Sequence, residues 1–353
     1  MAIDLLANVL ASIPQQFDPQ GVDLQNREAP HLAIMGKQFN GSQAMTWTVS
    51  DSGATASEVG EVDDIDSSEY TNDNRLMLTL PRARFRQTFG VSSKELAVCM
   101  NSRFASDMIA DLVGGYYLGA KSALARRIET QCFKGTGTAT SPKSGSVDSI
   151  YGVLTALITT GTYAGKDVST YTNMKSNITT SVGTLDKVKL RTASAAMKTK
   201  SGSSPEYWMG SPATVNQVVL LGDALQHITT AGSVPTPYHI GTPAFANGSP
   251  RCYFDGVPVF ENSAWDDGYL LGACANSFAL DILNERPVGD AFGSGTSSLV
   301  SNTGDRAEQL GIPVTLYSVG RSGPTHKFAL EVELGMKVRR GNATVLLKGI
   351  TIP

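Results

Sequence analysis

Two stretches of this sequence decide the fold: Met45-Thr46-Trp47-Thr48-Val49-Ser50 and, after a long polar loop, Arg75-Leu76-Met77-Leu78-Thr79-Leu80-Pro81-Arg82-Ala83-Arg84-Phe85-Arg86-Gln87-Thr88-Phe89. In the first stretch, Met45, Trp47 and Val49 alternate with Thr and Ser, as in a strand with one apolar face. The second stretch has a similar strand-like composition. Because the intervening loop is too long for an ordinary turn, residues 38–92 predict one extended β-hairpin.

The predicted hairpin is acidic at its tip and basic on its returning strand. A calcium loop is the sharper alternative for the tip, but Glu69 occupies the position that needs glycine, which favours a solvated or partner-facing loop. On the returning strand, Arg82, Arg84 and Arg86 share one face. No Lys or Arg occurs between Lys37 and Arg75, and the same interval holds Asp51, Glu58, Glu61, Asp63, Asp64, Asp66, Glu69 and Asp73.

Helical patterns follow the hairpin. Ser92-x-x-Glu95 matches a capping box. Apolar residues then recur every four positions and predict a helix of about 40 Å over residues 106–133, in which Gly114-Gly115 indicates a bend or a close helix contact. A second helix is predicted over Thr184–Lys200, with Leu185, Val188 and Ala196 facing inward. The basic residues of this helix favour a solvated face, with a DNA-facing lining as the alternative: Lys187, Lys189, Arg191, Lys198 and Lys200.

The rest of the chain predicts an α/β module followed by β-strands. Tyr207-Trp208-Met209 indicates a short strand, and Ser211-Pro212 indicates a helix N-cap that opens a helix running to Gly222-Asp223. Further strands are predicted at 257–260, 269–274, 278–283, 314–319 and 328–334. At the N-terminus, Leu6, Val9, Leu10 and Ile13 lie on one helical face, and Arg27–His31 predicts an extended arm.

Composition excludes several classes of protein. The charged fraction of this 353-residue chain is 17%, well below the roughly 25% of soluble domains, so much of its surface is expected to face other protein. A net charge of −3 provides no global positive field for nucleic acid or membranes. We find no signal peptide and no apolar run of roughly 18 residues, which predicts a protein retained in a cytoplasm. The four cysteines are scattered, which favours buried free thiols over a disulfide framework.

We recognise no catalytic or metal-binding motif in the sequence. Residues 161–167 fall one residue short of a phosphate loop, and the glycine-serine stretches near residues 294 and 322 miss the nucleophile elbow. Asp266 and Asp267 are adjacent, which in a loop favours a solvated turn over a catalytic pair. The four histidines are dispersed and form no Cys/His cluster. We therefore expect no enzyme activity, no cofactor and no metal.

The order of these parts resembles the major capsid protein of tailed bacteriophages, with the Hong Kong 97-type fold. Local support comes from Tyr207-Trp208-Met209-Gly210-Ser211-Pro212-Ala213-Thr214, from Phe254-Asp255-Gly256-Val257-Pro258-Val259 and from the tail between Phe328 and Ala343. The resemblance covers nearly the whole chain and implies an α+β fold. The implied parts are an N-terminal arm (1–37), an extended β-hairpin loop (38–92), a peripheral domain with a long spine helix (93–203), an axial α/β domain (204–284), and a return to the peripheral domain with the C-terminal strands (285–353).

The resemblance further implies a subunit that self-assembles as pentamers and hexamers into an icosahedral virion shell. The expected contents are double-stranded DNA, contacted without sequence specificity. The expected partners are a portal protein, a decoration protein and either a separate scaffold protein or no scaffold. Assembly is expected in the host bacterial cytoplasm, without a membrane partner. The arm and hairpin occupy residues 1–92, which leaves no room for the fused scaffolding domain of some members. Neither Lys37 nor Asn342 can be assigned to the covalent crosslinking that some members perform.

Subunit contacts are expected at the hairpin and the arm. Met45, Trp47, Val49, Leu6 and Leu10 are expected to bury apolar surface on neighbouring subunits, and Arg82, Arg84 and Arg86 to pair with acidic groups of an adjacent subunit. Two rival interpretations stay open. An encapsulin-type bacterial compartment shares the fold but encloses protein cargo, and a surface or adhesion protein should carry an export signal.

Overall fold

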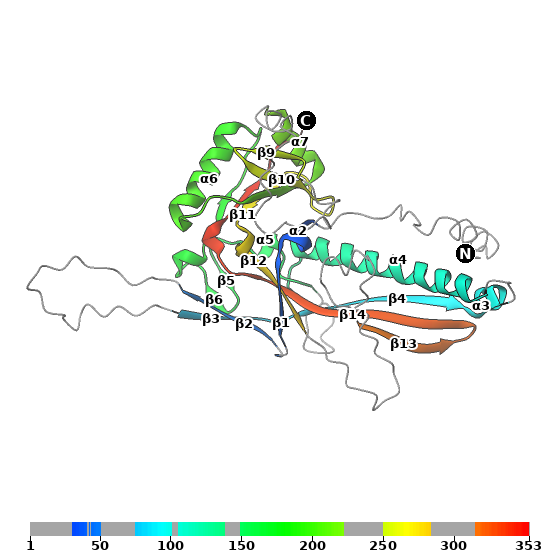
Figure 1. Ribbon diagram of the computed structural model, residues 1–353. Coiled ribbons are helices and arrows are strands. Elements are labelled where there is room, and N and C mark those ends of the chain that lie inside the picture. Colours follow the sequence, from blue (N-terminus) through cyan, green and yellow to red (C-terminus); the bar gives the residue numbers. More distant parts are fainter. Residues whose placement is uncertain are drawn as a thin grey trace, which may run out of the picture.

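The fold is α+β and combines a long helix, two main sheets and a projecting hairpin (Figure 1). The structure is a computed structural model that describes residues 30–40, 42, 44–50, 75–100, 105–137, 149–221, 250–283 and 315–352. The long helix and the first sheet form one elongated layer, and the second sheet with its helices lies on one side of that layer (Figure 1). No helix in these described ranges is long and apolar enough to cross a membrane.

The first sheet has five strands and lies beside the long helix. Its strand order is β1 (Gly36–Asn40), β12 (Phe278–Leu283), β14 (Thr325–Val338) and β13 (Thr315–Ser322), and β4 (Ala83–Ser92) also pairs with β14. Only the β1–β12 pair is parallel. In β4, Ala83 and Phe85 face inward while Arg84 and Arg86 face outward, so the period-two pattern of the sequence is confirmed in this strand.

The long helix α4 (Ala105–Lys134) packs along β4 and confirms the helix predicted over residues 106–133. Its 30 residues correspond to about 45 Å. It runs without interruption through Gly114-Gly115, and a Cβ on Gly115 would meet no atom of the described chain within 4 Å. The shorter helix α3 (Ser93–Met100) precedes it, and its capping box is present: the Ser92 amide donates to Glu95 Oε2 at 3.1 Å.

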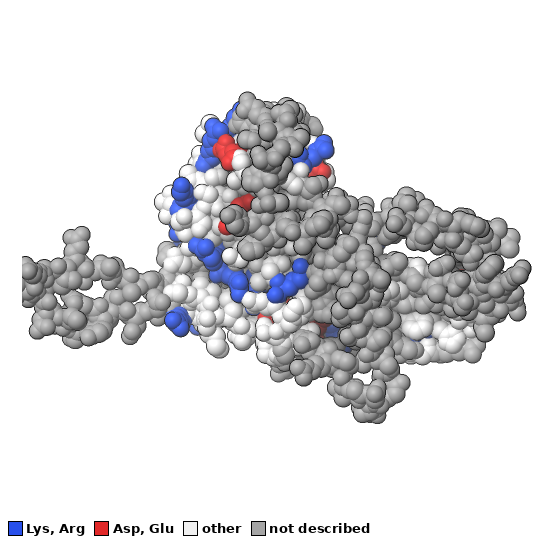
Figure 2. Space-filling model, viewed as in Figure 1, with Lys and Arg blue, Asp and Glu red and all other residues white. Residues whose placement is uncertain are grey.

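The second sheet has six strands and two covering helices. The strand order is β7 (Asn177–Thr179), β15 (Thr344–Lys348), β11 (Tyr269–Ala273), β8 (Tyr207–Gly210), β10 (Val257–Glu261) and β9 (Cys252–Phe254). Helices α6 (Lys187–Ser201) and α7 (Pro212–Leu220) pack on it through a separate apolar cluster that includes Trp208, Met197 and Val215. We call these strands and helices the six-stranded module. On the face in Figure 2, Lys and Arg side chains gather over this module.

The hairpin is formed by β2 (Met45–Ser50) and β3 (Arg75–Leu80), which pair in antiparallel register from Met45 opposite Leu80 to Ser50 opposite Arg75. The acidic interval between these strands lies outside the described residues. The returning strand differs from the prediction because it is interrupted at Pro81-Arg82, after which β4 joins the five-stranded sheet. Pro81 has no amide hydrogen to donate to a strand partner, so a break at this position is physically reasonable.

Short elements connect these parts. Of these, α2 (Pro30–Ile34) corrects the sequence interpretation, because the end of the predicted extended arm is helical and buried at His31 and Leu32. The others are α5 (Val153–Ala156), β5 (Thr162–Tyr163), β6 (Lys166–Asp167), η3 (Thr172–Met174), η6 (Ala275–Ser277) and η7 (Gly341–Ala343).

The helix α6 exists as predicted but faces the sheet with different residues. Its N-cap is Asp186, and its buried positions are Leu190, Ala193 and Met197. Val188 is 70% exposed and Ala196 is also exposed, so their predicted inward orientation is wrong. Leu185 is buried but lies before the first residue of the helix. Counting the helical repeat from Leu185 therefore places the predicted apolar face on the side of the helix that points away from the sheet.

The two sheets do not follow the segment boundaries implied by the resemblance. Strand β12 falls in the segment assigned to the axial domain, yet it is the neighbour of β1 and β14 in the five-stranded sheet. Strand β15 falls in the segment assigned to the peripheral return, yet it pairs with β11 and β7 in the six-stranded sheet. The chain therefore crosses between the two sheets after β4, after β11 and again after β14.

Candidate functional site

The base of the hairpin is fixed by a buried group of charges around Asp281 of β12. Arg82, in the link between β3 and β4, donates through Nε and Nη2 to Asp281 Oδ1 at 3.0 and 2.6 Å. Lys337 Nζ of β14 lies 3.0 Å from Asp281 Oδ2. The third guanidinium nitrogen of Arg82, Nη1, donates to the carbonyl of Ser42, just before β2. One carboxylate thus connects both ends of the hairpin to the five-stranded sheet.

This arrangement changes the interpretation of Arg82. Its side chain is 0% exposed, as is that of Asp281, so its partner is an acid of the same chain. The sequence pattern placed it on one strand face with Arg84 and Arg86, but the break at Pro81-Arg82 turns it into the interior. We therefore withdraw Arg82 from the residues expected to pair with an adjacent subunit.

Arg84 and Arg86 share the outward face of β4, as predicted, and both reach Glu331 on the neighbouring strand β14. Arg84 Nη2 lies 2.6 Å from Glu331 Oε2, and Arg86 pairs with the other carboxylate oxygen. The two arginine side chains are 45% and 58% exposed. They have an acidic partner within the chain, and their contact with a neighbouring subunit stays a prediction.

The apolar residues of the hairpin differ in how far their own chain covers them. Met45 is buried, and a Cβ on Gly335 would lie 2.4 Å from its terminal methyl, so this glycine makes room for it. Trp47 is half-buried and packs edge-on against Tyr163 of β5 at 6.3 Å between ring centres, and Val49 is also half-buried. Trp47 and Val49 therefore retain surface for a neighbour. Leu6 and Leu10 lie outside the described residues.

A second buried group of polar contacts, which we call the Glu129 joint, connects α2, the long helix and the six-stranded module. The carboxylate of Glu129, on α4, accepts hydrogen bonds from the backbone amides of His31 and Leu32, each at 3.1 Å, and from the side-chain amide of Asn262. Burial raises the pKa of Glu129 to about 7, although these donors counteract the rise. These contacts were not predicted from the sequence. The one local sign of them was an acidic residue, Glu129, beside the apolar Ile128 of the long helix.

The groups around Glu129 are uncharged near neutral pH. Burial lowers the pKa of His31 to about 3, and its ring lies edge-on to Trp265 and Phe278 at 5.5 Å each. Burial also raises the pKa of Cys132 and of Tyr207, the other titratable side chains that interact with Glu129. Glu129 is therefore the group of this joint whose charge changes near neutral pH.

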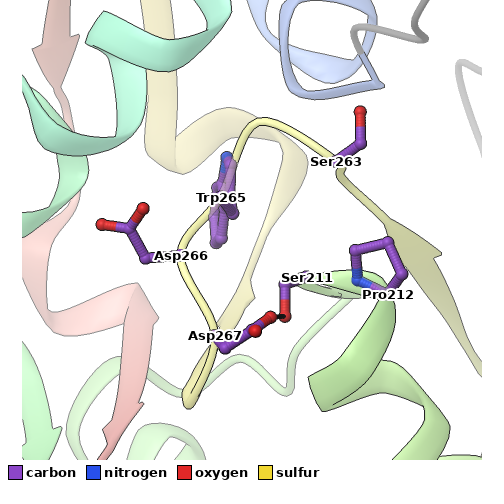
Figure 3. A pocket seen from close by; sticks show the side chains of 6 residues that line it. All are labelled: Ser211, Pro212, Ser263, Trp265, Asp266 and Asp267. Atoms are coloured by element: carbon purple, nitrogen blue, oxygen red, sulfur yellow. Dashed lines mark hydrogen bonds between the residues drawn. The ribbon is translucent and has the colours of Figure 1, made fainter.

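An open hollow of about 560 Å³ beside α7 is the candidate site for a catalytic or binding function (Figure 3). Ser211, the N-cap of α7, donates to Asp267 at 2.5 Å and accepts from the Thr214 amide. Asp266 points away from Asp267 in Figure 3 and pairs with Lys134 at 3.2 Å. These polar groups hold the helix end and the loop, and among the described residues no three metal-binding side chains come together.

Comparison with solved structures gives the fold. The capsid asymmetric unit of cyanophage A-1(L) aligns with a TM-score of 0.70 at 16% identity, over 94% of this chain and 95% of that one. The capsid of a native GTA particle aligns with a TM-score of 0.55 at 13% identity, over 92% of this chain and 91% of that one. The chain has a Hong Kong 97-type capsid fold. No protein-family model and no curated protein matches the sequence.

The assignment of the expected capsid parts to the described elements stays a prediction. It takes the β2–β3 hairpin as the extended loop, α4 as the spine helix, the five-stranded sheet as the peripheral domain and the six-stranded module as the axial domain. Most of the N-terminal arm lies outside the described residues. The two buried groups of polar contacts lie where elements of the structure meet: Asp281 at the base of the β2–β3 hairpin, and Glu129 between α4, α2 and Asn262 after β10.

Proposed function

We propose that this chain is a major capsid protein that self-assembles as pentamers and hexamers into an icosahedral shell around phage double-stranded DNA. The observation that supports this most is the capsid fold over nearly the whole chain. The role is structural, and the polar residues of the hollow at α7 serve the fold. The subunit works in the virion, after assembly in the host cytoplasm with portal, scaffold and decoration proteins.

The hairpin supports this proposal physically because its base is fixed by buried charges and the face of β3 opposite the buried Leu76 and Leu78 leaves apolar surface uncovered. Its base is held by the buried charges around Asp281, while Met77 of β3 is 63% exposed. At the edge of the five-stranded sheet, Phe39 of β1 is 51% exposed. Apolar side chains that a subunit leaves uncovered are suited to contacts with identical neighbours in a closed assembly.

The first experiment images the purified full-length protein by negative-stain electron microscopy. Uniform icosahedral particles are expected, and a stable monomer at high concentration contradicts the proposal. Nuclease-protected DNA in particles from infected or induced cells is expected as well. Particles filled with protein instead of DNA contradict the phage assignment and favour an encapsulin-type compartment.

A hairpin variant then tests how the shell is built. Ser50 and Arg75 face each other in the register, so an Asn-Gly turn in place of residues 51–74 closes β2 and β3 directly. We expect this variant to keep the melting temperature of the wild-type subunit but to form no shells. The control is Thr192→Ala, which alters an exposed polar residue of α6 and should assemble normally. Normal shells from the turn variant exclude an assembly role for the extended loop.

A further inference from the structure

Four basic residues form one exposed group where the end of α6 meets η7. Lys198 and Lys200 belong to the last turn of α6, and Arg339 and Arg340 lie between β14 and η7. Helix α6 packs on η7, and Arg340 Nη2 donates to the carbonyl of Ser201 at 3.1 Å. All four side chains are exposed. We call these four residues the α6–η7 basic patch. Lys198 and Lys200 belong to the six-stranded module, over which basic side chains gather in Figure 2.

The basic residues in the first half of α6 are used differently. Lys189 donates to the carbonyls of Val182 and Thr184 at 2.8 and 2.7 Å. Arg191 forms two hydrogen bonds with Asp255, each of 2.9 Å. Both side chains therefore have partners at the start of the helix, and their charge is partly compensated within the chain.

The α6–η7 basic patch has no such compensation. Among the residues that the structure describes, no carboxylate lies within ion-pair distance of Lys198, Lys200, Arg339 or Arg340. Among the described acids, Glu206 approaches this region, since it and Arg340 both act on Cys274, and it accepts a hydrogen bond from the Ala275 amide at 2.8 Å. Four cations and one nearby acid leave a local excess of positive charge on a chain whose net charge is −3.

A structural role at the helix end accounts for only part of this excess. Cations stabilise a helix C-terminus, but the end of a helix carries about half an elementary negative charge. Gly202 already closes the helix in a left-handed conformation, and Arg340 already binds the Ser201 carbonyl. Lys198, Lys200 and Arg339 therefore carry more positive charge than is needed to neutralise the helix C-terminus.

The surroundings of the patch indicate which kind of partner it fits. Protein interfaces concentrate aromatic and apolar residues at their centre and are depleted in lysine. The exposed large apolar residues of the described chain, such as Val188 and Leu220, lie outside the patch. Nearby side chains include the hydroxyls of Thr199, Ser201 and Ser203, of which Thr199 and Ser201 also donate to helix carbonyls. Lys and Arg combined with Ser and Thr are typical of surfaces that bind phosphate backbones.

We propose that the α6–η7 basic patch binds the phosphate backbone of the packaged double-stranded DNA without sequence specificity. This inference rests on the proposed function, because it takes the contents of the shell to be DNA. The module that carries the patch then presents this face to the interior of the particle. The sequence alone did not distinguish the five basic residues of α6 from one another. The structure assigns DNA binding to Lys198 and Lys200 at the C-terminal end of the helix, together with Arg339 and Arg340.

The test compares two triple variants of the full-length protein that lose the same charge. The patch variant is Lys198→Gln/Lys200→Gln/Arg339→Gln, which keeps the bond between Arg340 and Ser201. The control is Lys187→Gln/Lys189→Gln/Arg191→Gln, from the first half of the same helix. Binding to random-sequence double-stranded DNA is measured against salt concentration, and each lost phosphate contact should reduce the log–log slope by about 0.9.

The patch variant is expected to reduce the slope by about 3, and the control to leave it nearly unchanged. Equal reductions in both variants overturn the inference, because net charge alone would then explain the binding. An unchanged slope in the patch variant also overturns it. If the patch variant binds DNA normally but fails to form shells, the patch contacts acidic groups of a neighbouring subunit instead. Shell formation by the wild-type protein is scored separately, so the inference and the proposed function can fail independently.

Discussion

Arg82 and Asp281 form an ion pair that solvent does not reach, with Nη2 2.6 Å from Oδ1 and both side chains 0% exposed. The pair joins the link between β3 and β4 to the central strand β12. Lys337 binds the other oxygen of the same carboxylate. The direction in which the extended loop leaves the subunit therefore depends on one acid that lies far from the loop in the sequence.

Asp281→Asn should destabilise the subunit by about 3–5 kcal/mol, because it leaves Arg82 and Lys337 buried without an anionic partner. Urea unfolding monitored by circular dichroism measures this loss. Arg84→Gln is the matched control, since its partly exposed pair with Glu331 should contribute no more than about 1 kcal/mol. Equal effects of the two substitutions contradict a special role for the buried pair.

Glu129 should make the stability of the subunit depend on pH near neutrality. Its folded-state pKa of about 7 lies above the ordinary value of 4.5, so between these values the folded chain holds a proton that the unfolded chain releases. The stability contributed by this group is complete below pH 4.5 and is lost as the pH rises through 7. Relative to Glu129→Gln, the wild-type melting temperature should therefore fall between pH 4.5 and 7 and then level off, and taking this difference cancels the opposite effect of His31. A difference that stays constant over this interval shows that Glu129 keeps its ordinary pKa.

His31 should act in the opposite direction at lower pH. Its folded-state pKa of about 3 lies below the ordinary 6.5, so stability is lost as the pH falls below 6.5 and the unfolded chain gains a proton that the buried ring rejects. Neither ring nitrogen has a hydrogen-bond partner among the described residues. His31→Phe should therefore raise the melting temperature more at pH 5 than at pH 8. A gain of equal size at both values reflects packing alone.

Gly115 tests whether the spine helix touches a neighbouring subunit. A Cβ at this position meets nothing within 4 Å in the described chain, so Gly115→Ala should stabilise the isolated subunit by about 1 kcal/mol through helix propensity. Gly341→Ala is the contrasting variant, because its Cβ would lie 2.1 Å from the Met174 carbonyl oxygen and should destabilise the fold. Thermal unfolding measures both changes. If Gly115→Ala stabilises the subunit but prevents shell formation, a neighbour packs against this glycine.

The features that short-range patterns determine were predictable from the sequence. The alternation in residues 45–50 predicts a strand, and the four-residue period predicts α4 to within one residue at each end. The caps at Ser92 and Ser211 were recognisable because their hydrogen bonds span three residues. The order of these elements was sufficient to suggest the capsid fold.

Long-range pairing decided the rest. Whether Arg82 faces solvent or Asp281 depends on two residues separated by 199 positions, and no local period carries that information. The same holds for Glu129, which meets the amides of α2 and the side chain of Asn262 only after the chain has folded. The sequence by itself therefore determined the long helix, the hairpin strands and the order of the main elements, because local sterics and periodicity govern them. Only the tertiary structure decided which sheet β12 and β15 join and which charges are buried, because those depend on contacts between distant parts of the chain.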